Sequence, residues 1–308
     1  MGKEYKYKVA TRCFTFNHAP YIVDAMNGFA MQVTTFPVVT LIVDDASTDC
    51  EPEVIKQYLD EHFQVPYRTE ETEYAQIICA RHKTNENCEF VVFLLKYNHY
   101  SVKKSKLPYL SEWSDNAKYY ALCEGDDYWI HPNKLQMQVD LMENNPTVGL
   151  CYTAYRYFYE PTGQATDIVA HPNECSSKDF QWKVLIRSNV GTASVIMKAR
   201  LYDEIREKYN DDFKGYKMGD TQTWFHFARL SGIQYLPVVT MIYRKHEGSA
   251  TALNDYEKST MFQKDMLRMR ISLCNKYNAP ALVLKEINAN ISAMMIVNHL
   301  NGGGIIRL

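Results

Sequence analysis

The stretch from Lys118 to Trp129 constrains the fold more than any other part of the sequence. It starts as an apolar run typical of a buried strand and ends abruptly in Glu-Gly-Asp-Asp at residues 124–127. Gly125 allows a sharp turn, and adjacent carboxylates repel one another unless a counter-charge lies between them. A divalent cation such as Mg²⁺ or Mn²⁺ is one such counter-charge, because both ions take oxygen ligands. The alternative is a solvated acidic turn.

A second apolar run ends in the same way. Residues 40–43 (Thr-Leu-Ile-Val) lead directly into Asp44 and Asp45. Open α/β sheets bind their ligands at the carboxyl ends of their strands. Two strands that both finish in carboxylates therefore predict one shared binding site at that edge of a sheet.

Strand and helix patterns alternate over the first half of the chain, which predicts a Rossmann-like α/β fold with a central, mostly parallel mixed sheet flanked by helices. We expect strands at 7–16, 37–43, 65–67, 90–96 and 119–123, helices at 19–31, 52–62, 110–116 and 133–143, and an irregular polar insertion at 70–89. The pattern then loosens, with strands at 149–159, 190–197 and 233–243, helices at 200–209 and 221–231, and a helical tail from 256 to about 300.

Composition is that of an ordinary globular protein of 308 residues, with 46% hydrophobic and 23% charged residues. The net charge of -2 and the absence of a long basic run give no reason to expect a nucleic acid partner. No apolar run reaches the roughly 18–20 residues of a spanning helix, and no signal-peptide core opens the chain. We therefore expect a cytoplasmic protein, with peripheral contact at the inner membrane face left open.

Two other classes that gather acids at strand ends fit less well. In a receiver-type signalling domain the acidic pair follows the first strand, whereas here a complete strand and helix precede Asp44. A nucleotidyl transferase on a similar sheet needs a glycine-rich phosphate loop after its first strand, and residues 15–21 contain no glycine.

Five motifs occur in an order that resembles the inverting family 2 glycosyltransferases, which have the GT-A fold. They are residues 15–21, 41–49, 121–129, Gly219-Asp220 ahead of a helix, and 243–249. The resemblance implies a GT-A domain over 1–251, with a nucleotide-sugar-binding half at 1–145 and an acceptor-side half at 146–251. A helical C-terminal extension at 252–308 would follow it.

The resemblance also implies roles for residues of the first two strand ends. Thr15, Asn17 and Tyr21, together with Asp44 and Asp45, would hold the nucleotide, because a carboxylate accepts hydrogen bonds from a base N–H or ribose hydroxyls.

The metal and the diphosphate are assigned to later segments. Asp126, Asp127 and His246 match the metal and donor-sugar positions of the family, although Glu124 stands where the family usually has Asp. Lys103, in a lysine-rich segment, would neutralise the diphosphate, and a solvated basic loop is its alternative.

Asp220 matches the catalytic base of the family, which takes the proton of the attacking hydroxyl. From the residues alone, an Asp ahead of a helix is more simply an N-cap. Similarly, His246 is either a structural histidine or part of a phosphate-closing loop with Gly248 and Ser249.

The expected function is a metal-dependent inverting glycosyltransferase that uses Mn²⁺ or Mg²⁺. It would move a sugar from a nucleotide-diphospho-sugar, expected to be a UDP-sugar, to a hydroxyl of a glycan or lipid-linked acceptor in cell-surface polysaccharide synthesis. The alternative is a non-catalytic nucleotide-sugar or glycan-binding module, which would keep the metal site without depending on Asp220. The sequence leaves the sugar, the acceptor and the oligomeric state open.

Overall fold

The computed structural model describes residues 4–169, 179–188, 190–247 and 256–300. Its strands are β1 (Tyr7–Thr15), β2 (Val38–Asp44), β3 (Arg68–Glu71), β4 (Ala75–Arg81), β5 (Cys88–Leu95), β6 (Ala117–Leu122), β7 (Tyr128–Trp129), β8 (Val148–Tyr159), β9 (Gln164–Ala165), β10 (Ile196–Lys198) and β11 (Gly232–Lys245). Its α-helices are α1 (Ile22–Ala30), α2 (Glu51–His62), α3 (Ser111–Ser114), α4 (Lys134–Asn144), α5 (Phe180–Ile186), α6 (Ala199–Lys208), α7 (Asp220–Leu230), α8 (Tyr256–Lys276) and α9 (Ala281–Leu300).

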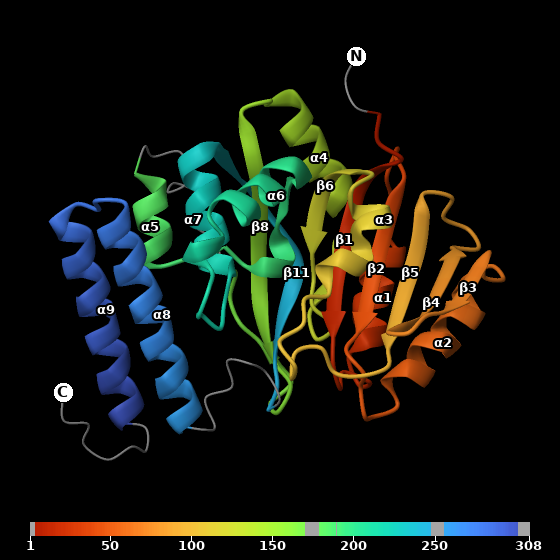
Figure 1. Cartoon of the computed structure of the whole chain (residues 1–308), viewed down its shortest axis with the longest axis horizontal. Coiled ribbons are helices and arrows are strands. Elements are labelled where there is room, and N and C mark those ends of the chain that lie inside the picture. The colour runs from red at the N-terminus through yellow and green to blue at the C-terminus, as the bar shows by residue number, and fades with distance from the viewer. Residues whose placement is uncertain (1–3, 170–178, 189, 248–255, 301–308) are drawn as a thin grey trace.

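All of these strands belong to one mixed sheet with a parallel centre (Figure 1). Its order is β3-β4-β5-β2-β1-β6-β10-β8-β11-β7, and β9 pairs with β8. Strands β5, β2, β1 and β6 run parallel, while β10 is antiparallel to both β6 and β8. Because β11 is parallel to β8, the carboxyl ends of β1, β2, β6 and β11 lie at one edge of the sheet. The predicted fold class is confirmed.

Helices cover both faces of the sheet. Helices α1, α2 and α4 pack on one face around Met26, Ile55 and Leu135, and helices α3 and α5 to α7 pack on the other. A strand that is covered on both faces has no solvent side, so every residue of β2 is buried. This burial explains why the central strands read as continuous apolar runs.

Two predicted segments were wrong at the margins of the sheet. The region 70–89 is not an irregular insertion, because it forms β3, β4 and the start of β5, which extend the sheet in antiparallel fashion. Strand β3 lies at the edge, with three of its four residues exposed, so its polar sequence conceals the strand. The short strand expected at 65–67 is absent, and Val65 is 90% exposed.

The second half holds two further corrections. Of the strand expected over 190–197 only the end is a strand, since Thr192–Ser194 form a 3₁₀ turn before β10. Helix α5 was not predicted. The helical tail is confirmed and consists of α8 and α9, an antiparallel pair beside α5 and α7 (Figure 1). None of the described helices is long and apolar enough to cross a membrane.

Candidate active site

Three ligand-type side chains meet where β1, β6 and β11 end. The Nε2 atom of His246 lies 3.1 Å from Oδ2 of Asp126, and Nε2 of His18 lies 4.0 Å from the same oxygen. One ligand atom from each of these residues falls within 4.8 Å of the other two. We call His18, Asp126 and His246 the edge cluster. His18 was not predicted, although it follows the first strand in the same way that the acids follow theirs.

Gly125 permits the ends of β6 and β1 to approach this closely. A Cβ atom at Gly125 would lie 2.1 Å from Oγ1 and 2.6 Å from Cβ of Thr15. Thr15 is β-branched and buried, so its side chain has little freedom to move away. The glycine is therefore needed for contact between two strand ends as well as for the turn.

The hydrogen bonds around His18 fix which of its nitrogens is free. Thr15 donates its hydroxyl proton to the fully buried Glu51, so toward Nδ1 of His18, at 3.2 Å, its oxygen acts as an acceptor. From this hydrogen-bond network we assign the ring proton to Nδ1, so that the lone pair of Nε2 faces Asp126. Glu51 also accepts the backbone N–H of His18 at 2.8 Å. Glu51 and Thr15 thus orient His18, a role that the sequence analysis missed.

Electrostatics in the edge cluster suit a cation. Burial lowers the pKa of His18, which keeps the ring neutral and able to bind a metal. Burial by itself would raise the pKa of Asp126, but the hydrogen bond from His246 and the two histidines bring the pKa below its ordinary value. Two imidazole nitrogens and one carboxylate can ligate a divalent metal ion, and this ligand set suits Mg²⁺ poorly because Mg²⁺ prefers oxygen ligands.

Asp127, the other predicted metal carboxylate, does not join the edge cluster. It is 2% exposed, and its Oδ1 accepts the backbone N–H of Arg244 at 2.9 Å. Burial and the charge of Asp126 raise its pKa well above the ordinary value. Arg244 also donates from Nε to the carbonyl of Asp126 at 2.9 Å. In this structure Asp127 helps to hold the acidic turn against β11.

The acids at the end of β2 are also engaged in internal contacts. Asp45 accepts the N–H groups of His99 at 2.7 Å and Tyr100 at 3.1 Å, and it pairs with Nζ of Lys106 at 2.7 Å. Asp44 is 1% exposed, and burial raises its pKa to about 6. The lysine that approaches these acids is Lys106. Lys103 is exposed and has a left-handed backbone, with φ of 55°.

Two other predicted donor-binding residues shape the loops around the site. Asn17 has φ of 56°, and its Oδ1 accepts the N–H of Thr48 at 2.7 Å, which joins the loops after β1 and β2. Tyr21 stacks at a tilt on His246, with ring centroids 4.6 Å apart. Nucleotide roles for these residues and for Asp44 and Asp45 remain predictions.

Asp220 lies in a cleft of about 740 Å³ that also exposes Glu124 and Thr192. It is the first residue of α7, and its Oδ2 accepts the hydroxyl of Thr192 at 2.6 Å. Gly219 occupies the N-cap position, and no side chain caps the helix there. The N-cap explanation for Asp220 is therefore wrong in this structure, because its carboxylate accepts the Thr192 hydroxyl and makes no capping hydrogen bond to α7.

Burial raises the pKa of both carboxyl groups in this cleft. Burial raises the pKa of Asp220, although the bond from Thr192 and the nearby Arg206 oppose the shift. Enclosure by the cleft walls, followed by the charges of Asp220 and Asp126, raises the pKa of Glu124 to about 8, even though its side chain still reaches solvent. The cleft therefore combines a carboxylate able to accept a proton with one that holds a proton near neutral pH.

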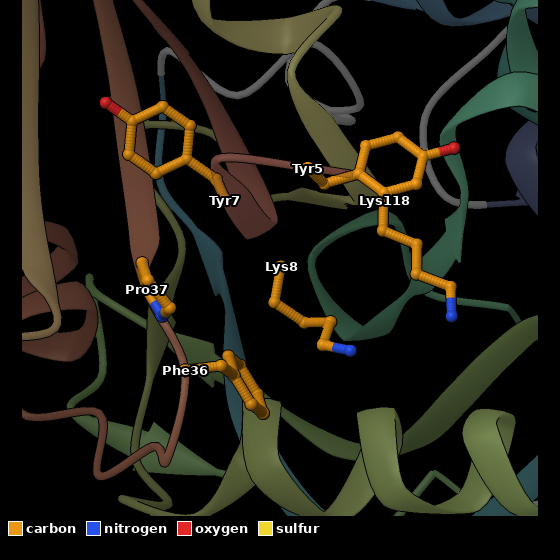
Figure 2. A pocket seen from close by; sticks show the side chains of 6 residues that line it. All are labelled: Tyr5, Tyr7, Lys8, Phe36, Pro37 and Lys118. Carbon is orange, nitrogen blue, oxygen red and sulfur yellow. The ribbon is translucent and has the colours of Figure 1, made fainter. Parts of the chain in front are cut away.

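A second cavity lies at the opposite edge of the sheet, where β1, β2 and β6 begin (Figure 2). It measures about 300 Å³, and among the described residues its lining contains no carboxylate. Its two lysines, Lys8 and Lys118, lie 3.2 Å and 2.8 Å from the same oxygen of Glu143, so one carboxylate offsets part of their charge. Ligand sites of α/β sheets lie at the carboxyl ends of strands, and the cleft at Asp220 is the stronger candidate.

The curated proteins that match this chain in sequence have no assigned function. No family model matches the chain. Uncharacterized proteins of Mycobacterium tuberculosis and Mycobacterium bovis are 28% identical to it over 235 residues, which are 75% of this chain. The chain spans 57% of the length of these relatives.

Solved structures support the fold. Residues 1–349 of S. aureus TarS, crystallised with UDP-GlcNAc, have a TM-score of 0.50 at 15% identity, and the match covers 96% of this chain and 73% of that fragment. The mannosyltransferase PcManGT of Pyrobaculum calidifontis, in complex with GDP-Man and Mn²⁺, also scores 0.50 at 15% identity, covering 98% of this chain and 77% of its own. The architecture is therefore that of the GT-A glycosyltransferases.

Proposed function

We propose that this chain is a metal-dependent inverting glycosyltransferase that moves a sugar from a nucleotide-diphospho-sugar to an acceptor hydroxyl. One observation carries the proposal. Asp220 is freed from capping its helix, is oriented by Thr192 at 2.6 Å, and opens into the same cleft as Glu124, which follows β6 two residues before Asp126. This arrangement supports a base and a cation site at one edge of the sheet, the combination that this chemistry requires.

Each residue of the site has a distinct role in the proposed reaction. Asp220 accepts the proton of the acceptor hydroxyl while that oxygen attacks the anomeric carbon from the face opposite the leaving diphosphate. The bond from the anomeric carbon to the phosphate oxygen breaks, and configuration inverts. A cation held by His18, Asp126 and His246 would offset the negative charge that develops on the diphosphate. Thr192 keeps the Asp220 carboxylate directed into the cleft.

A UDP-sugar is the first donor to test and a GDP-sugar is the second, because the two compared structures contain UDP-GlcNAc and GDP-Man. The decisive first measurement is thermal unfolding with UDP, GDP, dTDP or CDP, each with Mn²⁺, Mg²⁺ or EDTA. A nucleotide at about a hundred times its dissociation constant stabilises by roughly 2.7 kcal/mol. We expect one nucleotide to do so with Mn²⁺ and not with EDTA. If none does, the transferase proposal is wrong.

Asp220→Asn separates an enzyme from a binding module. We expect this variant to keep the metal-dependent nucleotide shift and to lose transfer by roughly 100- to 10,000-fold, the usual contribution of a positioned base. The matched control is Asp211→Asn, which removes an exposed carboxylate paired with Lys214 at 2.8 Å and should leave transfer unchanged. A wild-type protein that binds nucleotide but transfers no sugar would support the module.

The biological setting follows from the same proposal. We place catalysis in residues 1–251, with donor contacts in 1–145 and acceptor contacts in 146–251 and the helices that follow. Synthesis of a surface polysaccharide on a glycan or lipid-linked acceptor, at the cytoplasmic face of the membrane, is the role we propose. Activity in a membrane fraction supplied with labelled donor would test it.

A further inference from the structure

Helix α8 forms one wall of the cleft that contains Asp220. Three of its residues, Phe262, Met266 and Arg270, line this cleft. They are spaced four residues apart, so they lie on one face of the helix. The part of the chain to which the sequence assigned no motif therefore contributes directly to the candidate active site.

Hydrogen bonds join α8 and the turn after it to the rest of the protein. Asp212, 6% exposed, accepts hydrogen bonds from His226 at 2.9 Å, Lys276 at 2.5 Å and Tyr277 at 2.6 Å. At the cleft entrance, the backbone N–H of Lys217 donates to Asp265 of α8 at 2.8 Å. These contacts fix the position of α8 relative to α7, whose first residue is Asp220.

Arg270 is the unusual member of this wall. Its Nε is shielded from solvent and has no hydrogen-bond partner, and the bond from Nη1 to the carbonyl of Ile186 is long, at 3.4 Å. No carboxylate among the described residues forms an ion pair with Arg270. Arg268, two residues earlier, is instead exposed, pairs with Asp265 at 2.8 Å, and also donates to the carbonyl of Gly215.

The acids at the other end of the cleft do not compensate Arg270. The cation that acts on Asp220 is Arg206, and burial lowers the pKa of Arg270 with only Cys274 opposing that shift. A shielded guanidinium without an anion is unfavourable, and its planar fork matches a carboxylate or a phosphate. The cleft thus holds the carboxyl groups of Asp220 and Glu124, and its lining also contains the cationic side chains of Arg270, Lys217 and Lys245.

We propose that Arg270 determines acceptor specificity by binding an anionic group of the acceptor, a carboxylate or a phosphate, while the reacting hydroxyl lies at Asp220. This inference rests on the proposed transferase function. The acceptor class is accordingly an acidic glycan or a phosphate-bearing one, and neutral sugars are poor acceptors. Phe262 and Met266 would contact the apolar face of the sugar between its two polar ends.

The test uses three probes that differ only at C6: glucose, glucuronate and glucose 6-phosphate. Thermal unfolding of the full chain is followed as each is added at constant ionic strength, with EDTA and again with UDP and Mn²⁺. We expect one of the two anions to stabilise wild type and Arg268→Gln, with glucose having no effect. Arg270→Gln should need about 10- to 100-fold more anion, the loss typical of a charge-assisted hydrogen bond. Which anion acts distinguishes an acidic from a phosphorylated acceptor.

Two outcomes overturn the inference: neither anion stabilises the wild type, or Arg270→Gln responds as the wild type does. Arg270→Lys retains the charge without the planar fork and should keep part of the response. This variant replaces Arg270→Gln in the test if Arg270→Gln does not fold. An anion effect through Arg270 without any nucleotide effect would overturn the transferase proposal and the acceptor role together, and leave an anion site. With a working donor, Arg270→Gln should lower kcat/KM for p-nitrophenyl glucuronide or phosphorylated glucoside about 10- to 100-fold while leaving the neutral glucoside and donor hydrolysis unchanged.

Discussion

At the end of β2, Asp45 accepts three hydrogen bonds from the loop at 99–106, and Asp44 is buried beside it. At the end of β6, Asp127 accepts a backbone N–H from β11, whereas Asp126 faces two histidines. The two acidic pairs look alike in sequence, yet only the second contributes an atom to the edge cluster. Adjacent side chains leave the backbone in different directions, so a pair of acids seldom acts as a unit.

The difference also depends on what lies opposite each pair. The end of β6 faces the ends of β1 and β11, which supply His18 and His246. The end of β2 faces its own neighbour β5 and the loop that follows β5, which supplies backbone amides and Lys106. An acidic strand end becomes a candidate metal site or a loop anchor according to the segments that surround it.

Within this comparison of the two acidic pairs, the largest effect should come from substituting the two acids of the second pair one at a time. Asp126→Asn removes the carboxylate of the edge cluster, and we expect transfer to fall roughly 100- to 1,000-fold, as for loss of one transition-state contact. Asp127→Asn keeps an oxygen for the N–H of Arg244 and should cost less than about tenfold. Both are measured by sugar transfer at saturating donor and Mn²⁺. Equal losses would mean that both acids bind the metal.

The tight contact between strand ends makes the β6 end intolerant of a side chain. Gly125→Ala would place Cβ against Thr15, and we expect a loss of about 3 kcal/mol in unfolding free energy from overpacking. Gly163→Ala is the control, because its Cβ would meet nothing within 4 Å and only its left-handed backbone, with φ of 65°, costs about 1 kcal/mol. Urea unfolding gives both values. A Gly125→Ala protein as stable as the control would contradict the structure here.

The burial of Asp44 should be detectable in the pH dependence of the unfolding free energy. Its folded-state pKa of about 6 lies above the unfolded value, so its contribution to stability is present below about pH 4 and is lost as pH rises through about 6. The unfolding free energy of wild type relative to Asp44→Asn should therefore fall by about 2–3 kcal/mol between pH 4 and 7, at about 1.4 kcal/mol per unit. Urea unfolding in EDTA at several pH values measures it. Parallel curves for the two proteins would show that Asp44 is not penalised by burial.

The smallest effect concerns the loop anchor. Lys106→Met removes one partner of Asp45 and leaves its two backbone N–H donors, so we expect a loss of about 1–2 kcal/mol in stability. Lys103→Met, which alters an exposed residue of the same loop, should leave stability unchanged. If the role of Asp45 is to stabilise the loop, neither substitution should abolish nucleotide binding. A larger effect of Lys103→Met on nucleotide binding would support the diphosphate role predicted for Lys103.

Prediction from sequence succeeded where one residue pattern has one structural meaning. The apolar runs of β1, β2, β5 and β6 are buried on both faces, so they were recognised within one or two residues of their bounds. It failed at the edge strand β3, whose exposed glutamates read as a loop, and at Thr192–Ser194, where the predicted strand begins as a 3₁₀ turn. The conformation of edge and turn residues depends on their tertiary contacts. The local sequence pattern does not contain that information.

The sequence by itself determined the α/β architecture and the edge of the sheet at which chemistry is expected. Alternating apolar segments fix which faces are buried, and carboxyl ends of parallel strands must share an edge. Only the tertiary structure decided the partners. It joined His18 to Asp126 and His246, assigned Asp45 and Asp127 to internal contacts, directed Asp220 into the cleft and set Arg270 of α8 in its wall. These contacts join segments up to about 230 residues apart, and no local pattern specifies them.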